Sequence, residues 1–242
     1  MIEKKIKNYR LLIFKDKEEL TKKVSDFICD EISYKLQKKE RFQMCLSGGS
    51  TPKSVYSLIS KKNIEWSKVD VFLGDERCVD PESENSNTLM LKRTLFQNFS
   101  SQAYFYQIFN SVEINEEISK DLFLSKIKEK CSGYPPIFDL TLLGLGDDGH
   151  TASLFPNQRL INDNDLIIYT HGKGLKRISL TPKILSASSK VIFLVSGNNK
   201  KIALERLISE DESPDRTPAK LIKSNSEISI FCDSDASIDL LD

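Results

Sequence analysis

The chain has 242 residues, enough for one large domain or two small ones. Its 35 lysines and arginines balance 35 aspartates and glutamates, and a net charge of zero argues against a protein that mainly coats nucleic acid or an anionic membrane. The longest apolar runs are far shorter than the about 20 residues of a spanning helix. The apolar stretch after the basic N-terminus is too short for a secretory signal. We therefore expect a soluble, cytoplasmic protein with neither nucleic acid nor membrane as a partner.

The five cysteines are scattered, with an odd total and no Cys-x-x-Cys pair. This usage argues against a disulfide framework or a structural zinc site and fits a reducing compartment. Cys45 and Cys232 lie inside apolar, strand-like runs, so we interpret both as small core residues.

Strand-like and helix-like segments alternate along the chain. Asp16 with Glu19 three residues later is typical of a helix N-terminus, and Thr51 before Pro52 predicts a second one. Because strands separated by helices pair in parallel through crossovers, we predict one α/β domain, residues 1–242, with a mainly parallel sheet. In chain order, the patterns predict strands over residues 10–14, 42–46, 69–73, 138–143, 166–170, 191–195 and 228–232, and helices over residues 17–36, 52–59, 87–96, 113–130 and 198–208.

Three polar, glycine-rich motifs begin where an apolar strand ends: Ser-Gly-Gly-Ser-Thr at residues 47–51, Gly-Asp-Glu-Arg at 74–77, and Gly-Leu-Gly-Asp-Asp-Gly-His at 144–150. Ligands of open parallel sheets bind outside the carboxyl ends of the strands. We therefore expect the three motifs to converge on one cleft.

The first motif has the features of a phosphate cradle. Gly48 and Gly49 let the backbone approach a ligand, and a following helix directs its free N–H groups at it. Ser50 and Thr51 add hydroxyl donors. The motif lacks the Lys-Ser/Thr ending of a nucleotide P-loop and the third glycine of the dinucleotide fingerprint, and Pro52 replaces the last glycine of a serine-hydrolase elbow. A monophosphate site is favoured over the alternative, a turn whose glycines only satisfy geometry.

The second motif places three charges at the end of an apolar strand, which is costly unless they are paired or used. Arg77 could clamp a phosphate or carboxyl oxygen through its fork of donors. On spacing alone, a local salt bridge with Asp75 or Glu76 is the favoured alternative.

The third motif contains one of only two histidines. Asp148, two residues before His150, could orient the ring and support the imidazolium, which makes His150 a candidate general base; a structural or solvated histidine is the alternative. His171 stands in a Thr-His-Gly-Lys-Gly run that we expect to be an exposed turn. Without His-Glu-x-x-His or paired histidines, we expect no catalytic metal.

Three basic residues follow His171: Lys173, Lys176 and Arg177. They could give the phosphate a second cationic contact, or they could form a solvated basic loop.

In order, the chain reads LSGGSTPKSVY, W-x-x-VDVFLGDERCV, LLGLGDDGHTASLFP, RISLTPKIL and VSGNNKKIAL. These segments, between about Leu11 and Ala236, resemble the 6-phosphogluconolactonases of the pentose phosphate pathway, and DGHTASLFP after Gly-x-Gly is the most specific of them. The resemblance implies the modified Rossmann-like α/β/α sandwich shared with glucosamine-6-phosphate deaminases and ribose-5-phosphate isomerases. It implies hydrolysis of 6-phospho-D-glucono-1,5-lactone to 6-phospho-D-gluconate without a metal or nucleotide cofactor. Glucose-6-phosphate dehydrogenase and 6-phosphogluconate dehydrogenase would be its pathway neighbours.

The resemblance also assigns roles to residues. His150 is the expected general base, and Asp148 the residue that orients it, with Asp147 left open from sequence. Arg77 is an expected substrate-binding cation and is also expected to be catalytic, since its positive charge, or loop N–H groups, would stabilise the oxyanion. The other residues expected to bind substrate are Gly48, Gly49, Ser50 and Thr51 of the cradle, the cation Arg177, and Lys200 of the Gly-Asn-Asn-Lys segment.

Two departures from the family pattern stand out. Consecutive prolines often precede the arginine matching Arg177, but residues 172–176 read Gly-Lys-Gly-Leu-Lys, so the loop and the basic side chain that reaches the ligand could differ. Phe231 stands where the family often has tryptophan, a change that we expect to affect packing only.

The alternatives are a glucosamine-6-phosphate deaminase or sugar-phosphate isomerase on the same scaffold, and a non-catalytic sugar-phosphate sensor. A deaminase would carry an Asn-Glu-Pro segment after the histidine, whereas HTASLFP follows here. A sensor would be expected to lose His150 or Arg77. The limits Met1 and Asp242 favour a free-standing protein over one module of a fused enzyme.

Overall fold

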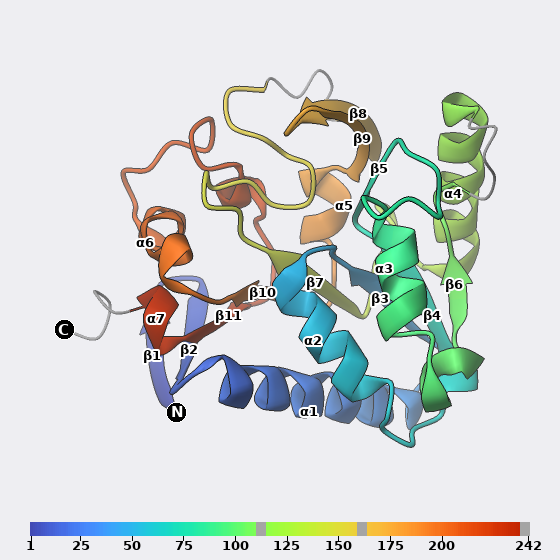
Figure 1. Ribbon diagram of the computed structural model, residues 1–242, viewed down its shortest axis with the longest axis horizontal. Coiled ribbons are helices and arrows are strands. Elements are labelled where there is room, and N and C mark those ends of the chain that lie inside the picture. The colour runs from blue at the N-terminus through green and yellow to red at the C-terminus, as the bar shows by residue number, and fades with distance from the viewer. Residues whose placement is uncertain (110–114, 159–163, 238–242) are drawn as a thin grey trace.

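An eight-stranded sheet forms the centre of the computed structural model, which describes residues 1–109, 115–158 and 164–237 (Figure 1). The order across the sheet is β1-β2-β11-β10-β7-β3-β4-β6. In chain order these strands are β1 (Ile2–Ile6), β2 (Tyr9–Phe14), β3 (Phe42–Leu46), β4 (Val69–Leu73), β6 (Tyr104–Tyr106), β7 (Leu140–Gly144), β10 (Val191–Val195) and β11 (Ile228–Asp233).

Every neighbouring pair in this sheet is parallel except the hairpin of β1 and β2. The predicted mainly parallel α/β sheet is therefore confirmed. The last strand of the chain, β11, lies inside the sheet between β10 and β2, not at its edge.

Helices flank the sheet on both faces. All residues of β3, β4 and β10 are buried, and because successive side chains point to opposite faces, both faces must be covered. Two of the helices, α1 and α2, pack against each other (Figure 1). The helices are α1 (Lys17–Leu36), α2 (Ser50–Ile59), α3 (Asn87–Thr94), α4 (Glu116–Lys130), α5 (Pro182–Ser186), α6 (Lys201–Ile208) and α7 (Ser234–Ser237).

Helix α1 begins as its sequence predicts. The Asp16 side chain accepts a hydrogen bond from the backbone N–H of Glu19 at 2.8 Å, which satisfies one of the free donors of the first turn. Leu20, Val24, Ile28 and Ile32 recur at helical spacing, form an apolar stripe that faces the sheet, and are fully buried.

A second, three-stranded antiparallel sheet stands beside the carboxyl end of β4. Its strands, in spatial order, are β5 (Asp75–Arg77), β9 (Leu175–Leu180) and β8 (Ile167–Gly172). Strands β8 and β9 are joined by Lys173 and Gly174, whose φ angles of 52° and 79° are both positive, as a tight hairpin turn requires. Of the two interpretations left open for these basic residues, a solvated loop that extends through Arg177 is wrong, because β9 begins at Leu175. His171 is exposed but lies in β8, two residues before the turn at Lys173 and Gly174.

Several boundaries also differ from the predictions. Helix α3 ends at Thr94, two residues early, and a 3₁₀ turn, η3 (Asn198–Lys200), precedes α6. Helix α4 begins at Glu116, and the predicted start at residue 113 lies outside the described residues. Strands β1 and β6 carry no apolar periodicity, since one is a charged edge strand and the other has three residues.

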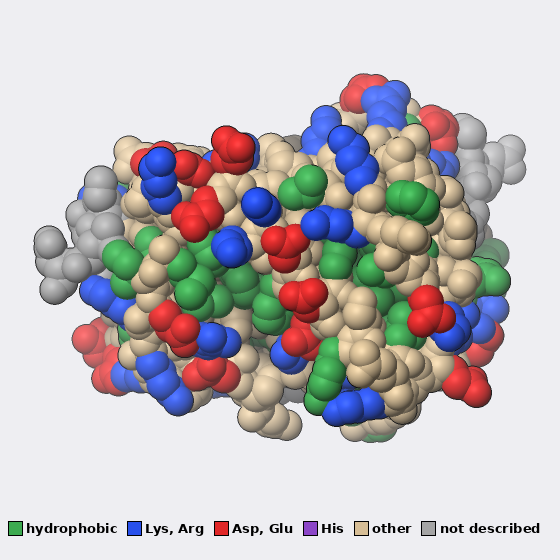
Figure 2. All heavy atoms as spheres, turned by 90° about the horizontal axis from the view of Figure 1, so that it is seen from below, with side chains coloured by type: hydrophobic (Ala, Val, Ile, Leu, Met, Phe, Trp, Pro, Cys, Tyr) green, Lys and Arg blue, Asp and Glu red, His purple; other side chains and the backbone are tan. Residues whose placement is uncertain are grey.

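Acidic and basic side chains are interspersed on the face where α1 lies (Figure 2). That face has no patch of one sign, in line with the balanced charge of the chain. Within the described residues, none of the helices has the length and apolar character needed to cross a membrane. Cys45 and Cys232 are fully buried, as predicted for core residues.

Candidate active site

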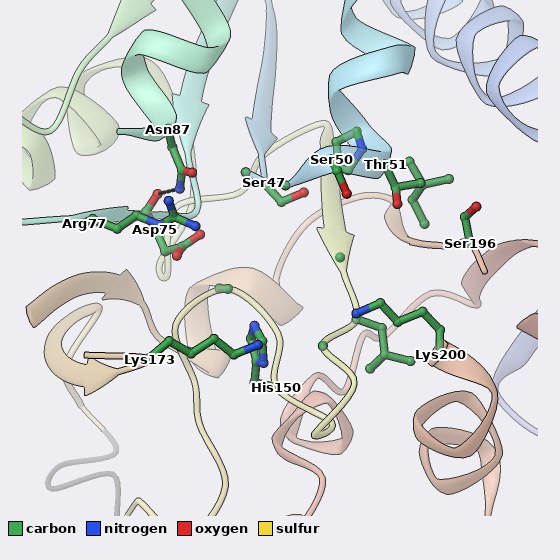
Figure 3. A pocket seen from close by; sticks show the side chains of 18 of the residues that line it. Ser47, Ser50, Thr51, Asp75, Arg77, Asn87, His150, Lys173, Ser196 and Lys200 are labelled. Carbon is green, nitrogen blue, oxygen red and sulfur yellow. Dashed lines mark hydrogen bonds between the residues drawn. The ribbon is translucent and has the colours of Figure 1, made fainter. Parts of the chain in front are cut away.

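The three motifs line one cavity of about 220 Å³ at the carboxyl ends of β3, β4, β7 and β10 (Figure 3). In the view of Figure 3, Ser50 and Thr51 lie above the cavity and His150 lies below it. Asp75 and Arg77 lie on one side of the cavity and Lys200 on the other. The expected convergence of strand ends therefore brings residues far apart in sequence around a single space.

The upper wall is the N-terminus of helix α2. The helix begins at Ser50 and its N-cap is Gly49, with φ 112°, so the predicted N-cap at Thr51 is wrong. No side chain caps the helix, and no acidic residue lies in its first turn. Its first N–H groups and its partial positive charge are therefore available to an anion. The Ser47 hydroxyl beside them is buried without a hydrogen-bond partner.

Gly48 is required by a close approach. A Cβ at this position would lie 2.0 Å from Oδ1 of Asn87, the first residue of α3. The Asn87 amide donates to the backbone oxygen of Asp75 at 3.0 Å. Asn87 therefore lies against the cradle and is hydrogen-bonded to β5, a position that the sequence pattern around it did not predict.

The lower wall carries His150 held by Asp148. Oδ1 of Asp148 lies 2.5 Å from Nδ1 of the ring and accepts the backbone N–H of His150 at 3.0 Å. Burial by itself raises the pKa of Asp148, but the hydrogen bonds from His150 outweigh it and hold that pKa well below its usual range. An ionised Asp148 fixes the proton on Nδ1 and leaves Nε2 as the basic nitrogen.

This pair needs a glycine beside it. A Cβ on Gly146 would lie 2.0 Å from Nδ1 of His150 and 2.6 Å from Oδ1 of Asp148. The ring of Phe155 also contacts the imidazole, with ring centroids 4.8 Å apart. Gly146 and Phe155 together therefore restrict the position of the imidazole.

The second aspartate of the motif faces elsewhere. Oδ1 of Asp147 lies 3.3 Å from Nζ of Lys173, and both side chains are more than half exposed. Between the two candidates that the sequence leaves open, the geometry thus selects Asp148 as the partner of His150.

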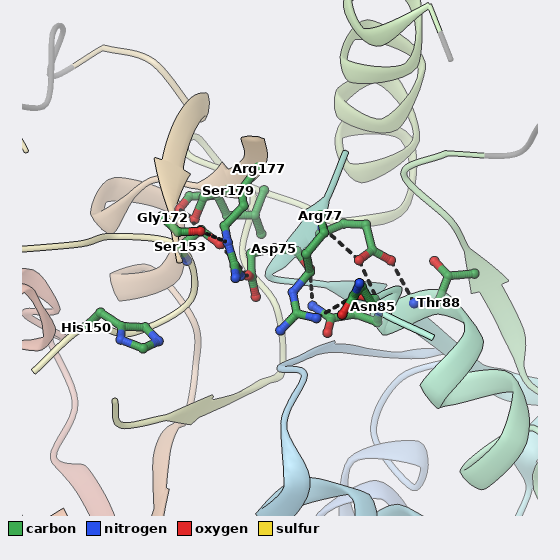
Figure 4. A network of polar contacts seen from close by, with 12 residues as sticks. Asp75, Arg77, Asn85, Thr88, His150, Ser153, Gly172, Arg177 and Ser179 are labelled. Carbon is green, nitrogen blue, oxygen red and sulfur yellow. Dashed lines mark hydrogen bonds and ion pairs between the residues drawn. The ribbon is translucent and has the colours of Figure 1, made fainter. Parts of the chain in front are cut away.

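Two arginines face each other across β5 and β9, where Arg77 pairs with Arg177 (Figure 4). The Arg177 guanidinium is almost fully buried, with NH1 3.8 Å from Oδ2 of Asp75. Burial, and secondarily the charge of Arg77, lower the pKa of Arg177. Nε of Arg77 is buried without a partner. Like charges directly opposite in a sheet are destabilising, so this arrangement is suited to an anion that lies between them.

Glu76 points away from the cavity and caps a helix. Its carboxylate accepts the backbone N–H groups of Arg77 and Asn87, each at 2.8 Å, and of Thr88 at 2.7 Å. Burial raises the pKa of Glu76, and these hydrogen bonds oppose it. The favoured local-salt-bridge interpretation of the motif is thus wrong for Glu76, whose partners are the N–H groups at the start of α3.

Of the remaining predicted cations, some line the cavity and one points away from it. Lys173 and Lys200 line the cavity, and burial lowers the pKa of Lys200. Lys176 points outward and pairs with Glu116 on α4. Of the three basic residues after His171, the cavity therefore receives Lys173 and Arg177.

Sequence reasoning missed the residues that hold the loop after β10. Ser196 lines the cavity and donates to Oδ2 of the buried Asp233 at 2.5 Å, and Oδ1 of Asp233 accepts the N–H of Gly197 at 3.0 Å. The sequence signal that could have pointed to them is Asp233, an aspartate at the end of the apolar strand β11. In the described parts of the chain, no three acidic, histidine or cysteine side chains are grouped to hold a metal ion.

The fold and this cavity define an α/β protein with a cationic ligand site at the carboxyl end of its sheet. The family model for glucosamine-6-phosphate isomerases/6-phosphogluconolactonase matches residues 15–230. A 6-phosphogluconolactonase of Nostoc sp. is 32% identical over 232 residues, which cover 94% of this chain and 97% of the relative.

Solved structures of 6-phosphogluconolactonases have the same fold as this chain. A 6-phosphogluconolactonase from Shewanella baltica superposes with a TM-score of 0.84 at 25% identity, covering 94% of this chain and 99% of that one. The enzyme from Thermotoga maritima gives a TM-score of 0.78 at 27% identity, covering 92% and 98%. The chain therefore belongs to the glucosamine-6-phosphate isomerase/6-phosphogluconolactonase family, and within it to the lactone hydrolases, which confirms the resemblance found in the sequence.

Proposed function

We propose that the protein hydrolyses 6-phospho-D-glucono-1,5-lactone to 6-phospho-D-gluconate, with His150 as general base. The observation that carries the proposal is the position of the Asp148-bound imidazole, which lines the same cavity as the uncapped N-terminus of α2. A general base and a phosphate site in one cavity are what hydrolysis of a phosphorylated lactone requires.

The substrate's phosphate binds at the N-terminus of α2. The donors are the N–H and hydroxyl groups of Ser50 and Thr51, with Lys200 across the cavity as a cation. Burial that lowers the pKa of Lys200 marks a desolvated ammonium group, which gains from a bound anion. Arg177 adds positive charge to the wall and strengthens binding of the whole substrate.

The reaction then follows from the hydrogen-bond pattern. Nδ1 of His150 donates to Asp148, so Nε2 removes a proton from the water that attacks C1 of the lactone. Asp148 stabilises the imidazolium that forms. Arg77 or the N–H groups of the neighbouring loops stabilise the oxyanion. The imidazolium returns the proton to the ring oxygen as the bond between C1 and that oxygen breaks.

The test is turnover of freshly generated 6-phosphogluconolactone, coupled to 6-phosphogluconate dehydrogenase and corrected for spontaneous hydrolysis. Removal of a general base costs about 10²–10⁴-fold in rate, so His150→Ala should lose most turnover and keep its affinity for 6-phosphogluconate. His171→Ala is the matched control, because this second histidine is exposed in β8 and does not line the cavity. Full turnover by His150→Ala would refute the mechanism.

A second assay, incubation with glucosamine 6-phosphate followed by measurement of ammonia, separates the proposal from a deaminase. Release of ammonia from glucosamine 6-phosphate would support a deaminase. A sugar-phosphate isomerase would need a carboxylate base at C1 or C2 of the sugar. Of the two candidates, Glu76 is committed to the N-terminus of α3, whereas Asp75 lines the cavity.

A further inference from the structure

Asp75 is a carboxylate in a cavity whose other charged side chains are cations. It is the only acidic side chain among the described residues that line the cavity, which also contains Arg77, Lys173, Arg177 and Lys200. A negative charge in a site for an anionic substrate weakens phosphate binding, so its presence there requires another use.

The carboxylate is firmly held by one of its two oxygens. Asp75 is 4% exposed, and Oδ2 accepts the hydroxyl proton of the fully buried Ser153 at 2.5 Å. The guanidinium of Arg177 approaches the same oxygen at 3.8 Å. Among the described residues no donor is hydrogen-bonded to Oδ1, so that oxygen remains as an acceptor for a ligand in the cavity (Figure 4).

The position of Asp75 selects one part of a bound sugar. Ser50, Thr51 and Lys200 lie toward one side of the cavity and Asp75 lies on the opposite side (Figure 3). In a six-membered lactone ring, C2 lies opposite C5, the atom that carries the phosphate-bearing C6, and C1 and C3 flank C2. With the phosphate at α2 and C1 at His150, the hydroxyl groups on C2 and C3 therefore face Asp75.

We infer that Asp75 determines specificity by accepting a hydrogen bond from a hydroxyl group on the C2–C3 edge of the sugar ring. An ionised carboxylate only accepts hydrogen bonds, and a hydroxyl donor to a charged acceptor forms one of the stronger kinds. The inference rests on the proposed lactonase site but concerns recognition, not chemistry. It explains why a cationic cavity keeps one acid, anchored by Ser153 at one oxygen.

The experiment measures binding without turnover, so that its result does not depend on lactonase activity. The probes are 1,5-anhydroglucitol 6-phosphate, a stable ring with the same hydroxyls, and its 2-deoxy, 3-deoxy and 4-deoxy forms, with inorganic phosphate as a further probe. In calorimetric titrations of the unmodified protein, the 2-deoxy or the 3-deoxy probe should bind with an affinity about 10- to 100-fold lower than that of the probe with all its hydroxyl groups. The affinity for the 4-deoxy probe should fall less.

Asp75→Asn should abolish that discrimination and leave the affinity for inorganic phosphate equal or higher, because a negative charge has been removed. Glu76→Gln is the matched control, since this neighbouring buried carboxylate faces α3 and not the cavity, and it should keep the discrimination. If Asp75→Asn does not fold, Ser153→Ala releases the anchored oxygen and should weaken the same preference.

Three results would overturn the inference: equal affinity of the unmodified protein for all ring probes, an unchanged preference in Asp75→Asn, or an equal loss for every probe including phosphate. Absence of lactone turnover in the unmodified protein, with the discrimination present, would instead contradict the proposed function alone.

Discussion

Replacement of Gly146 by alanine tests whether the position of His150 sets the rate. The Cβ would lie 2.0 Å from Nδ1 of His150, so the imidazole must retreat by roughly 1.4 Å to restore ordinary van der Waals contact. The φ angle of Gly146 is not in the left-handed region, so alanine brings no backbone strain of that kind. A displacement of about 1 Å at a reacting group costs about 10²-fold in rate, and we expect kcat to fall by at least about that factor.

The assay is coupled lactonase turnover, with KM and the melting temperature measured in parallel. KM should change little, because the cradle at α2 lies across the cavity from His150. Gly74→Ala is the matched control, since its Cβ would meet Sγ of Cys45 at an ordinary 3.4 Å. An unchanged kcat in a folded Gly146→Ala protein would refute the reasoning that Asp148 and Gly146 together place the base.

Two further predictions concern charged residues of the site. Arg177→Ala should mainly raise KM in steady-state assays, because it removes binding present in both ground and transition states, and an effect confined to kcat would place this arginine at the reacting centre. Asp148→Asn should lower the melting temperature at neutral pH, with a deficit that narrows as the pH falls below about 5. The folded protein holds the pKa of Asp148 below its ordinary value, so the ionised carboxylate stabilises the fold at any pH above that ordinary value. This stabilisation is lost as the pH falls toward the lowered pKa. A deficit that stays constant with pH would contradict the pairing of Asp148 with His150.

The sequence predicts those parts of the fold that repeat a local pattern. The stripe from Leu20 to Ile32 and the capping pair of Asp16 and Glu19 depend only on neighbouring residues, and the structure has both. The short strand β6 and the second sheet depend on pairing between distant segments, such as Arg77 with Arg177, which no local pattern contains.

The location of the site could be predicted because each of its three motifs begins at the carboxyl end of a strand. Parallel pairing brings those ends together, so the joint position of Gly48, Arg77 and His150 follows from topology. The choice between Asp147 and Asp148 depends on how one glycine-rich loop turns. The contribution of Asn87 arises only when α3 packs against Gly48. Neither the choice of Asp148 nor the role of Asn87 can therefore be predicted from the sequence alone.

The pleat of β5 divides two adjacent acids between two tasks. Asp75 is turned to the ligand cavity, while Glu76 accepts hydrogen bonds from the buried backbone N–H groups at the start of α3. Substitutions in β5 would thus give two different phenotypes. Changes at Asp75 would alter which sugar phosphates the protein binds, whereas changes at Glu76 would reduce the amount of folded protein that a cell retains.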